Sequence, residues 1–283
     1  MAFDPASSSS PAYPRDAALA ALQWYIDNGV DEVMGDSPLS RYGLGFAPAP
    51  QKQPVSNSAS ASASVTAPMG ASEGRQQALT LAKSAGSLEE LRAVIAAFDG
   101  ISIKKTAMNM VFGHGNPKAR VMVIGDVPAA DDDKSGLPLQ GAAGHLFDKM
   151  LASIGLDRQE QDSPSSVYVT NILNWRPPGN RAPSQAELDM SLPFIERHIQ
   201  LIAPEFIVTL GALPAQCLLA RSESLSKLRQ KKLTYTPQAQ ELVIATASCP
   251  LLVTFSPDYL LNAPAQKRDA WTDLQSLQAA LAD

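Results

Sequence analysis

The sequence is poor in the residues that bind metals and cross-link chains. It contains two cysteines, Cys217 and Cys249, and three histidines that stand far apart from one another. Neither a zinc-ligand spacing nor the four thiolates of an iron–sulfur cluster can be drawn from so few ligands in one chain. A secretory signal and an apolar run long enough to span a bilayer are also missing. We therefore expect a cytoplasmic monomer that contacts no membrane and carries no bound metal.

Most of the chain has no excess of charge of either sign. The net charge is −5, but residues 1–74 hold three basic and seven acidic side chains, which leaves 20 basic and 21 acidic ones in the remainder. Phosphate neutralisation supplies most of the non-specific affinity for nucleic acid. A nearly neutral domain can therefore bind DNA or RNA only through a local basic stripe. With 45 % hydrophobic residues among 283, the chain can bury a large core.

Composition divides the chain into three parts. Residues 1–45 include an amphipathic helical pattern at 16–28, and residues 46–74 are an Ala/Ser/Pro-rich stretch without periodicity, which predicts a disordered linker. Residues 75–283 are expected to form one α/β domain. The N-terminal helix could bind a protein partner or pack against its own chain, and the sequence does not separate these alternatives.

Apolar runs typical of strands alternate with helical patterns in the third part. Continuous β-branched runs, as expected of strands covered on both faces, lie at 119–124, 167–172, 206–210 and 242–247, and 251–255 is a candidate for a further strand. Helical patterns lie at 144–154, 184–202, 212–220 and 265–281, with another after a capping box of Ser87 and Glu90. The alternation predicts a three-layer α/β/α fold with a central, mostly parallel four-stranded sheet. Ligands of such sheets bind beyond the carboxyl ends of the strands.

The loop after the first strand contains Gly125, Asp126 and Val127, followed by an acidic stretch and a glycine-rich segment at 136–144. Glycines let a backbone approach a ligand closely. Asp126 is the one carboxylate placed directly after a strand, where it could polarise water or simply accept hydrogen bonds from neighbouring backbone N–H groups.

The loop at 171–181 carries two arginines, a tryptophan, several carboxamides and a pair of prolines. Arg176 and Arg181 can each make bidentate contacts to phosphate, with help from backbone amides at Gly179 and Asn180, and Asn171 can read a base edge. The alternative is that the tryptophan packs in the core and the arginines cap helices. We favour a surface that faces nucleic acid.

A third cluster follows the last candidate strand and includes Ser256, Pro257 and Tyr259. No histidine lies near Ser256 in the sequence and no nucleophile-elbow pattern surrounds it, which argues against a hydrolase triad. The basic run at 227–232 is typical of a solvated face, although it could also track a phosphate backbone.

Taken in order, these motifs resemble the bacterial and archaeal uracil-DNA glycosylases of the iron–sulfur type, usually called family 4. The resemblance covers about residues 91–281 and rests most on the string Arg-Pro-Pro-Gly-Asn-Arg at 176–181. It implies that the chain flips uracil out of DNA and hydrolyses the N-glycosidic bond. It also implies the following site residues: Gly125, Asp126 and Val127 at the attacking water, Leu139 beneath the uracil, Asn171 on the uracil edge, Ser256 beside the uracil carbonyl, and Arg176, Gly179, Asn180, Arg181, Pro257 and Tyr259 on DNA.

The sequence departs from the family at several of these positions. Members usually have Glu in place of Asp126, Gly in place of Ala129, Phe in place of Leu139 and His in place of Ser256. The positions of the four cluster cysteines hold Phe98, Ile101, Trp175 and Ser191. The resemblance therefore implies no iron–sulfur cluster here, and apolar packing in its place.

Two hypotheses about function stay open. In the first, the chain is a uracil-DNA glycosylase without its cluster, active or residually active on uracil-containing DNA. In the second, it is a catalytically impaired relative that keeps the fold and binds DNA through the arginine loop.

Overall fold

The computed structural model describes residues 71–161, 163–229, 231–239 and 248–282. The helical pattern at 16–28, most of the expected linker and the apolar run at 242–247 lie outside these residues. The described residues belong to the second of two units into which the chain divides, Ser64–Asp283.

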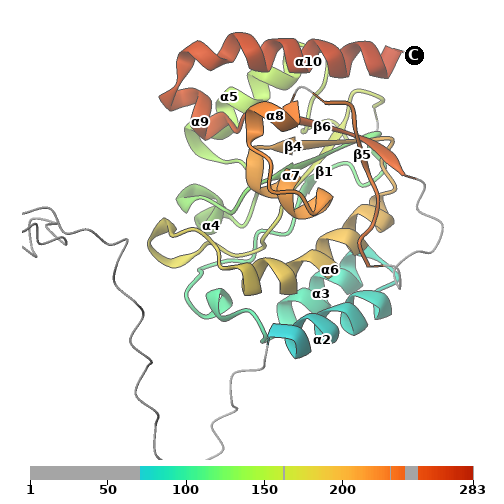
Figure 1. Cartoon of the computed structure of the whole chain (residues 1–283), viewed down its shortest axis with the longest axis vertical. Helices are drawn as coiled ribbons and strands as arrows, with labels where there is room; N and C mark the ends of the chain where they lie inside the picture. The colour runs from blue at the N-terminus through green and yellow to red at the C-terminus, as the bar shows by residue number, and fades with distance from the viewer. Residues whose placement is uncertain (1–70, 162, 230, 240–247, 283) are drawn as a thin grey trace, which may run out of the picture. The chain divides into compact units, whose positions relative to one another are not determined.

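A six-stranded sheet forms the middle layer of this unit, in the order β1-β3-β2-β4-β6-β5 (Figure 1). The four inner strands run parallel, and a short strand pairs antiparallel at each edge. The strands are β1 (His114–Gly115), β2 (Val121–Gly125), β3 (Val167–Asn171), β4 (Phe206–Leu210), β5 (Leu233–Tyr235) and β6 (Cys249–Thr254). The expected parallel four-stranded centre is confirmed, and the two edge strands extend it.

Both faces of the inner strands are buried, which explains their continuous apolar character. Met122 and Ile124 of β2 belong to one core cluster, whereas Val121 and Val123 belong to another on the opposite face. Side chains alternate between the faces of a strand, so a strand covered on both faces needs apolar residues at every position.

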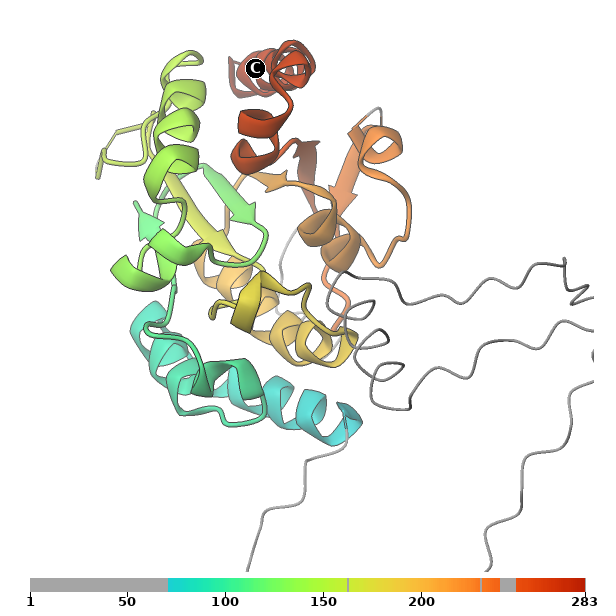
Figure 2. The same ribbon diagram turned by 90° about the vertical axis from the view of Figure 1, so that its left-hand side faces the viewer.

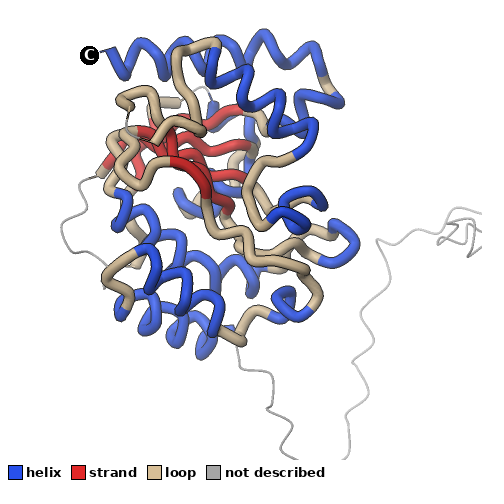
Figure 3. Tube along the Cα trace, turned by 180° about the vertical axis from the view of Figure 1, so that it is seen from behind, coloured by secondary structure: helices blue, strands red, loops and turns tan. Residues whose placement is uncertain are grey.

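Helices cover the two faces of the sheet. The first core cluster joins the sheet to α2 (Ala71–Ser84), α3 (Leu88–Ala97) and α6 (Gln185–Ile202). The second joins it to α5 (Gly141–Ala152) and α10 (Lys267–Ala282). Figure 2 and Figure 3 show the strands between these two helical layers. The three-layer α/β/α prediction is confirmed.

Two expected helix starts are present. The Ser87 hydroxyl accepts the backbone N–H of Glu90 at 3.1 Å at the start of α3. At the start of α6, the Ser184 hydroxyl accepts the N–H of Glu187 at 3.3 Å, and the Glu187 carboxylate accepts the N–H of Ser184 at 2.7 Å. Such reciprocal caps satisfy amide groups that have no partner within the helix.

Several elements differ from the expectation. Helix α2 begins at Ala71, inside the stretch assigned to the linker, and buries Ala78 and Ala82. The fourth parallel strand is β6, at the candidate position 251–255. The short helices α4 (Ala130–Ser135), α8 (Leu225–Arg229) and α9 (Pro257–Asn262) are not predicted by the sequence, whereas α7 (Ala212–Leu219) lies where the pattern at 212–220 predicts a helix. None of the helices in the described ranges is long and apolar enough to cross a membrane.

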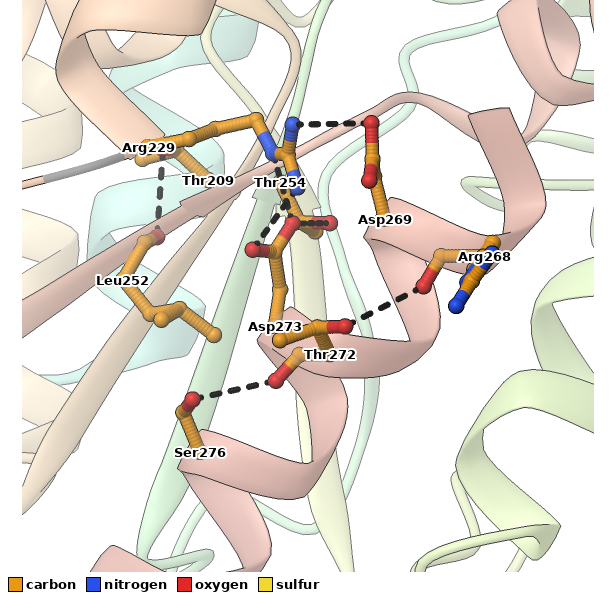
Figure 4. Close-up of polar contacts among 9 residues, drawn as sticks. All are labelled: Thr209, Arg229, Leu252, Thr254, Arg268, Asp269, Thr272, Asp273 and Ser276. Atoms are coloured by element: carbon orange, nitrogen blue, oxygen red, sulfur yellow. Dashed lines mark hydrogen bonds and ion pairs between the residues drawn. The ribbon is translucent and has the colours of Figure 1, made fainter. Parts of the chain in front are cut away.

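An ionic cluster fastens the carboxyl end of β6 to two helices (Figure 4). Arg229 of α8 donates two hydrogen bonds to Asp273 of α10, at 2.7 and 3.0 Å, and the Thr254 hydroxyl donates to the same carboxylate at 2.8 Å. The Arg229 guanidinium also lies 4.2 Å from the centre of the Phe255 ring. Ser256 follows Phe255 in the chain, so this ionic cluster fixes the position at which the loop after β6 begins.

Candidate functional site

A pocket of about 240 Å³ lies at the carboxyl ends of the inner strands. It is lined by the loops after β2, β3 and β6 together with the end of β4, as expected for a parallel sheet. Its described lining residues are Gly125, Asp126, Val127, Pro128, Ala129, Asp132, Leu139, Asn171, Pro177, Asn180, Leu210, Ser256, Pro257 and Asp258.

A larger hollow of about 660 Å³ lies between α2, α6 and residues 238–239. Its lining includes no residue of a strand and none of the residues that the sequence predicts for the site. The smaller pocket is therefore the better candidate for chemistry.

Asn171 ends β3 and is 3 % exposed. Its side-chain oxygen, Oδ1, has no hydrogen-bond partner among the described residues. A Cβ atom on Gly125 would lie only 2.7 Å from this oxygen, so only glycine leaves room for the carboxamide at that point. A buried polar atom without a partner costs about 1–3 kcal/mol, which a ligand that donates a hydrogen bond would recover.

Asp126 follows β2 and accepts the backbone N–H of Val127 with Oδ1 at 2.9 Å. Burial raises the pKa of Asp126, and the nearby Asp258 raises it further. A Cβ atom on Gly211 would lie 4.0 Å from Oδ2 of Asp126 and 3.9 Å from the Cβ of Ser256, so both side chains flank Gly211. One oxygen of Asp126 thus accepts a backbone hydrogen bond, and the other lies beside Gly211, as Ser256 does.

Asp132 was not predicted as a site residue, yet it joins two loops of the pocket. Its Oδ2 accepts the N–H of Ala129 at 3.0 Å, and its Oδ1 accepts the N–H of Gln140 at 2.7 Å. Burial raises the pKa of this carboxyl as well. Leu139, beside Gln140, lines the pocket with φ of 53°, and its carbonyl accepts a hydrogen bond from Arg158 at 2.8 Å. The run of acidic residues at 131–133 was the only sequence signal for this role.

Ser256 is the N-cap of α9, and its hydroxyl accepts the N–H of Tyr259 at 3.3 Å. Pro257 and Asp258 form the first turn and line the pocket. The Tyr259 ring instead stacks on Phe255, with 5.4 Å between the ring centres. The cap explains why a serine fits here, since serine is among the preferred N-cap residues.

The loop at 176–181, which we call the arginine loop, has one polar side chain that borders the pocket and two arginines that do not. Asn180 lines the pocket and accepts the Nε–H of the half-buried Arg176 at 3.0 Å. Arg181 makes a bidentate pair with Glu187, at 2.6 and 2.9 Å, and this hydrogen bonding raises the pKa of Arg181 and lowers that of Glu187. Gly179, with a left-handed φ of 64°, lies in the turn between Arg176 and Arg181.

Eight predicted residues therefore meet in one pocket: Gly125, Asp126, Val127, Leu139, Asn171, Asn180, Ser256 and Pro257. Four others, Arg176, Gly179, Arg181 and Tyr259, are not among its lining residues. Sequence reasoning missed Asp132 and Asp258, since both lie in short helices that the apolar pattern did not indicate.

The four positions at which the resemblance implies cluster cysteines do not suit iron and sulfur. Phe98, Ile101 and Trp175 belong to one buried apolar cluster. Ser191 is also buried, and its hydroxyl donates to the carbonyl of Ile172 at 2.7 Å. These side chains provide no thiolate, whereas iron–sulfur clusters are held by cysteine. No group of acidic, histidine or cysteine side chains suited to a metal ion occurs in the described part of the chain.

The mostly parallel sheet, covered by helices on both faces, with a small pocket at the carboxyl ends of its inner strands, defines an α/β protein whose pocket lies where ligands of such sheets bind. The chain belongs to the uracil DNA glycosylase superfamily, whose family profile matches residues 112–275.

Three proteins similar to this chain are each named type-4 uracil-DNA glycosylase. One from Sulfurisphaera tokodaii is 30 % identical over 177 residues, covering 61 % of this chain and 78 % of the relative. One from Pyrobaculum aerophilum is 31 % identical, covering 66 % and 91 %. One from Archaeoglobus fulgidus is 40 % identical, covering 46 % and 62 %.

Proposed function

We propose that this chain binds DNA, takes one extruded base into the pocket and hydrolyses its N-glycosidic bond, with uracil released slowly. The names of its relatives support a role in the repair of uracil-containing DNA. The volume supports the binding of one base, because about 240 Å³ lies below the ~300–1,000 Å³ typical of pockets for drug-sized ligands.

The unpaired oxygen of Asn171 is the observation that carries the proposal. A carboxamide offers one donor and one acceptor in a plane, which matches the edge of a base. Uracil presents an N–H between two carbonyls, and Asn171 Oδ1 supplies an acceptor for that N–H. Because the extruded base loses its stacking and pairing in DNA, at a cost of a few kcal/mol, such contacts are needed to hold it.

Asp126 is the group that we assign to the attacking water. Its Oδ1 is held by the N–H of Val127 at 2.9 Å, which leaves the second oxygen to orient a water and to take up a proton. Leu139, Leu210 and Pro257 supply apolar walls against which the base can pack.

Arg176 is the arginine that we assign to the DNA backbone. It is partly accessible, and among the described residues its side chain bonds to a neutral carboxamide, so its charge can be directed to a phosphate. Arg181 is already paired with Glu187. Its contribution to DNA binding is to hold the loop at 176–181 against α6.

The second candidate, a catalytically impaired DNA-binding relative, is favoured by one observation. Among the described residues of the pocket there is no imidazole or other cation that could stabilise negative charge on departing uracil. Preorganised donors of that kind are worth about 2.7–4 kcal/mol in other enzymes. The slow release in our proposal takes this loss into account.

A nicking assay on a duplex with a single deoxyuridine separates the candidates. The unmodified chain should produce abasic sites slowly, and Asn171→Ala should remove this activity while the affinity for the duplex changes little. Asn171→Asp is the matched variant, because it keeps the size of the side chain and replaces the amide donors with a second oxygen. No abasic product at high protein concentration, with DNA binding retained, would favour the second candidate. If Asn171→Ala cleaved as fast as the unmodified chain, the pocket would not be the site.

A further inference from the structure

The pocket is rich in negative charge. Asp126, Asp132 and Asp258 all line it, whereas none of its described lining residues is a lysine, an arginine or a histidine. The carboxyls also influence one another, since Asp258 adds to the effect of burial in raising the pKa of both Asp126 and Asp132. Charges in partly buried surroundings interact over several ångströms, because little water screens them. The pocket therefore opposes a ligand that becomes negative.

The pocket offers hydrogen-bond acceptors to a ligand that donates. Asn171 is almost fully buried and its Oδ1 lacks a partner. The Ser256 hydroxyl already accepts the N–H of Tyr259, and both oxygens of Asp132 accept backbone N–H groups. The acceptors left for a ligand include Asn171 Oδ1 and the second oxygen of Asp126, which match the N–H groups of a base, whereas the Ser256 O–H and the Asn171 amide can still donate to a carbonyl.

The charge of a base before and after its release distinguishes two classes of substrate. When uracil leaves, the electron pair of the broken bond makes the ring an anion, which needs a donor or a cation beside it. An N-alkylated purine, such as 7-methylguanine in DNA, carries a positive charge in its ring and leaves as a neutral molecule. We infer that the pocket prefers an N-alkylated, positively charged base to uracil, an inference that rests on the base removal proposed above.

The balanced reaction uses only water and groups of this chain. The bond from sugar C1′ to the ring nitrogen breaks, and its electron pair neutralises the cationic ring. The oxygen of a water molecule bonds to C1′, and a proton of that water passes to the carboxylate of Asp126. The products are an abasic site, a neutral alkylated base and a protonated Asp126, which returns its proton to the solvent. Ser256 has no anion to stabilise in this reaction, so the imidazole of the relatives is not needed.

The test compares two duplexes of the same sequence, one with a single 7-methylguanine and one with a single deoxyuridine. The full chain is incubated with each, and the free base is measured by mass spectrometry after subtraction of the spontaneous loss without protein. We expect 7-methylguanine to be released at least roughly tenfold faster than uracil, since a single charge interaction in such surroundings reaches that size. Asp126→Asn should lose this release.

Asp258→Asn examines the charge directly, because it keeps the shape of the side chain. It should lower the preference for 7-methylguanine over uracil by roughly twofold to fivefold, because Asp258 is exposed and water screens its charge. Asp269→Asn is the control, because this carboxylate is also exposed, at 57 %, but does not line the pocket. It should leave the preference unchanged, and circular dichroism should show that both variants are folded.

The remaining outcomes separate the inference from the proposed function. Uracil released as fast as 7-methylguanine, or faster, would overturn the inference and leave the proposed function in place. Release of 7-methylguanine alone would support the inference and remove uracil from the proposed function. If neither base were released above the spontaneous rate, both would be wrong.

Discussion

The resemblance to family 4 implies a histidine in place of Ser256, beside the carbonyl of the departing uracil. We predict that Ser256→His raises the rate of uracil release by about a hundredfold, because a donor aimed at developing charge contributes on that scale. The nicking assay on a deoxyuridine duplex measures this change. The substitution also removes the N-cap of α9, at a cost of about 1 kcal/mol in the free energy of unfolding.

Ser256→Ala is the matched control, because it removes the same cap without adding a ring. It should show the loss of stability and no gain in rate. An unchanged rate in a folded Ser256→His variant would mean that the loop after β6 does not direct residue 256 at the base.

The pH dependence of base release depends on Asp126. Burial and the nearby Asp258 raise its pKa above the ordinary aspartate value of 3.8. The carboxylate that accepts the proton is lost as pH falls through this raised pKa. We therefore predict that kcat/KM declines in acid at a pH above the usual aspartate range. Asp258→Asn should move the decline to lower pH, since it removes a negative neighbour. A pH–rate profile with an acid limb unaffected by Asp258→Asn would contradict this assignment.

The raised pKa values of the pocket carboxyls also determine how the free energy of unfolding changes with pH. In the unfolded chain Asp126, Asp132 and Asp258 ionise at lower pH than in the folded one. Their contribution to the free energy of unfolding is therefore fully present below the unfolded pKa and is lost as pH rises through the folded pKa. At neutral pH the ionised carboxylates therefore lower the free energy of unfolding, which is typical of residues at functional sites.

The join between β6, α8 and α10 depends on one carboxylate. Asp273 takes two hydrogen bonds from Arg229 and one from Thr254, and the Arg229 side chain is only 13 % exposed. We predict that Asp273→Ala lowers the free energy of unfolding by about 3–5 kcal/mol, because it leaves a buried cation without its partner. Denaturant unfolding measures the difference.

Asp269→Asn is the comparison for this prediction. Asp269 lies 3.8 Å from the same guanidinium, but its side chain is 57 % exposed. Its removal should cost at most about 1 kcal/mol, as is usual for exposed pairs. Equal effects of the two substitutions would show that Arg229 is not held mainly by Asp273.

The sequence predicted those elements whose pattern is long and apolar. The inner strands β2, β3 and β4 and the capped helices α3 and α6 stand where β-branched runs and capping boxes indicated them. It did not predict α2, because alanines supply much of its buried face and their pattern resembles that of a flexible stretch. The short helices α4 and α9 are held by loop contacts of Asp132 and Ser256, which no periodicity reveals.

The sequence predicts where the site lies, but only some of the residues and contacts that form it. The rule that ligands bind beyond the carboxyl ends of parallel strands brought Gly125, Asn171 and Ser256 together. The pairing of Arg181 with Glu187 depends on how the loop at 176–181 meets α6, which is a tertiary contact without a sequence signal. The charge of the pocket likewise became visible only when α4 and α9 placed their carboxylates on the same cavity.

The second unit, Ser64–Asp283, is expected to fold without the residues before it. We predict that a chain beginning at residue 64 unfolds at the same temperature as the full chain and releases bases at the same rate. Thermal unfolding followed by circular dichroism, together with the nicking assay, checks both statements. A lower melting temperature would show that residues 1–63 contribute to the stability of this unit.

A chain beginning at residue 86 is the contrasting truncation, since it also lacks α2. That helix buries Ala78 and Ala82 in the core it shares with α6. Their loss exposes apolar surface, and the melting temperature should fall by about 4 °C or more. An unchanged melting temperature would place the domain boundary after α2.

The pocket takes its lining from segments as far apart in the sequence as Gly125 and Asp258. During synthesis the N-terminal parts of a chain emerge first and begin to fold. The loop at 176–181 is therefore made well before Ser256 and Asp258 close the pocket. A chain interrupted between them lacks Ser256, Pro257 and Asp258, and with them part of the pocket lining. Under the proposed function, only the finished chain would therefore be able to remove a base from DNA.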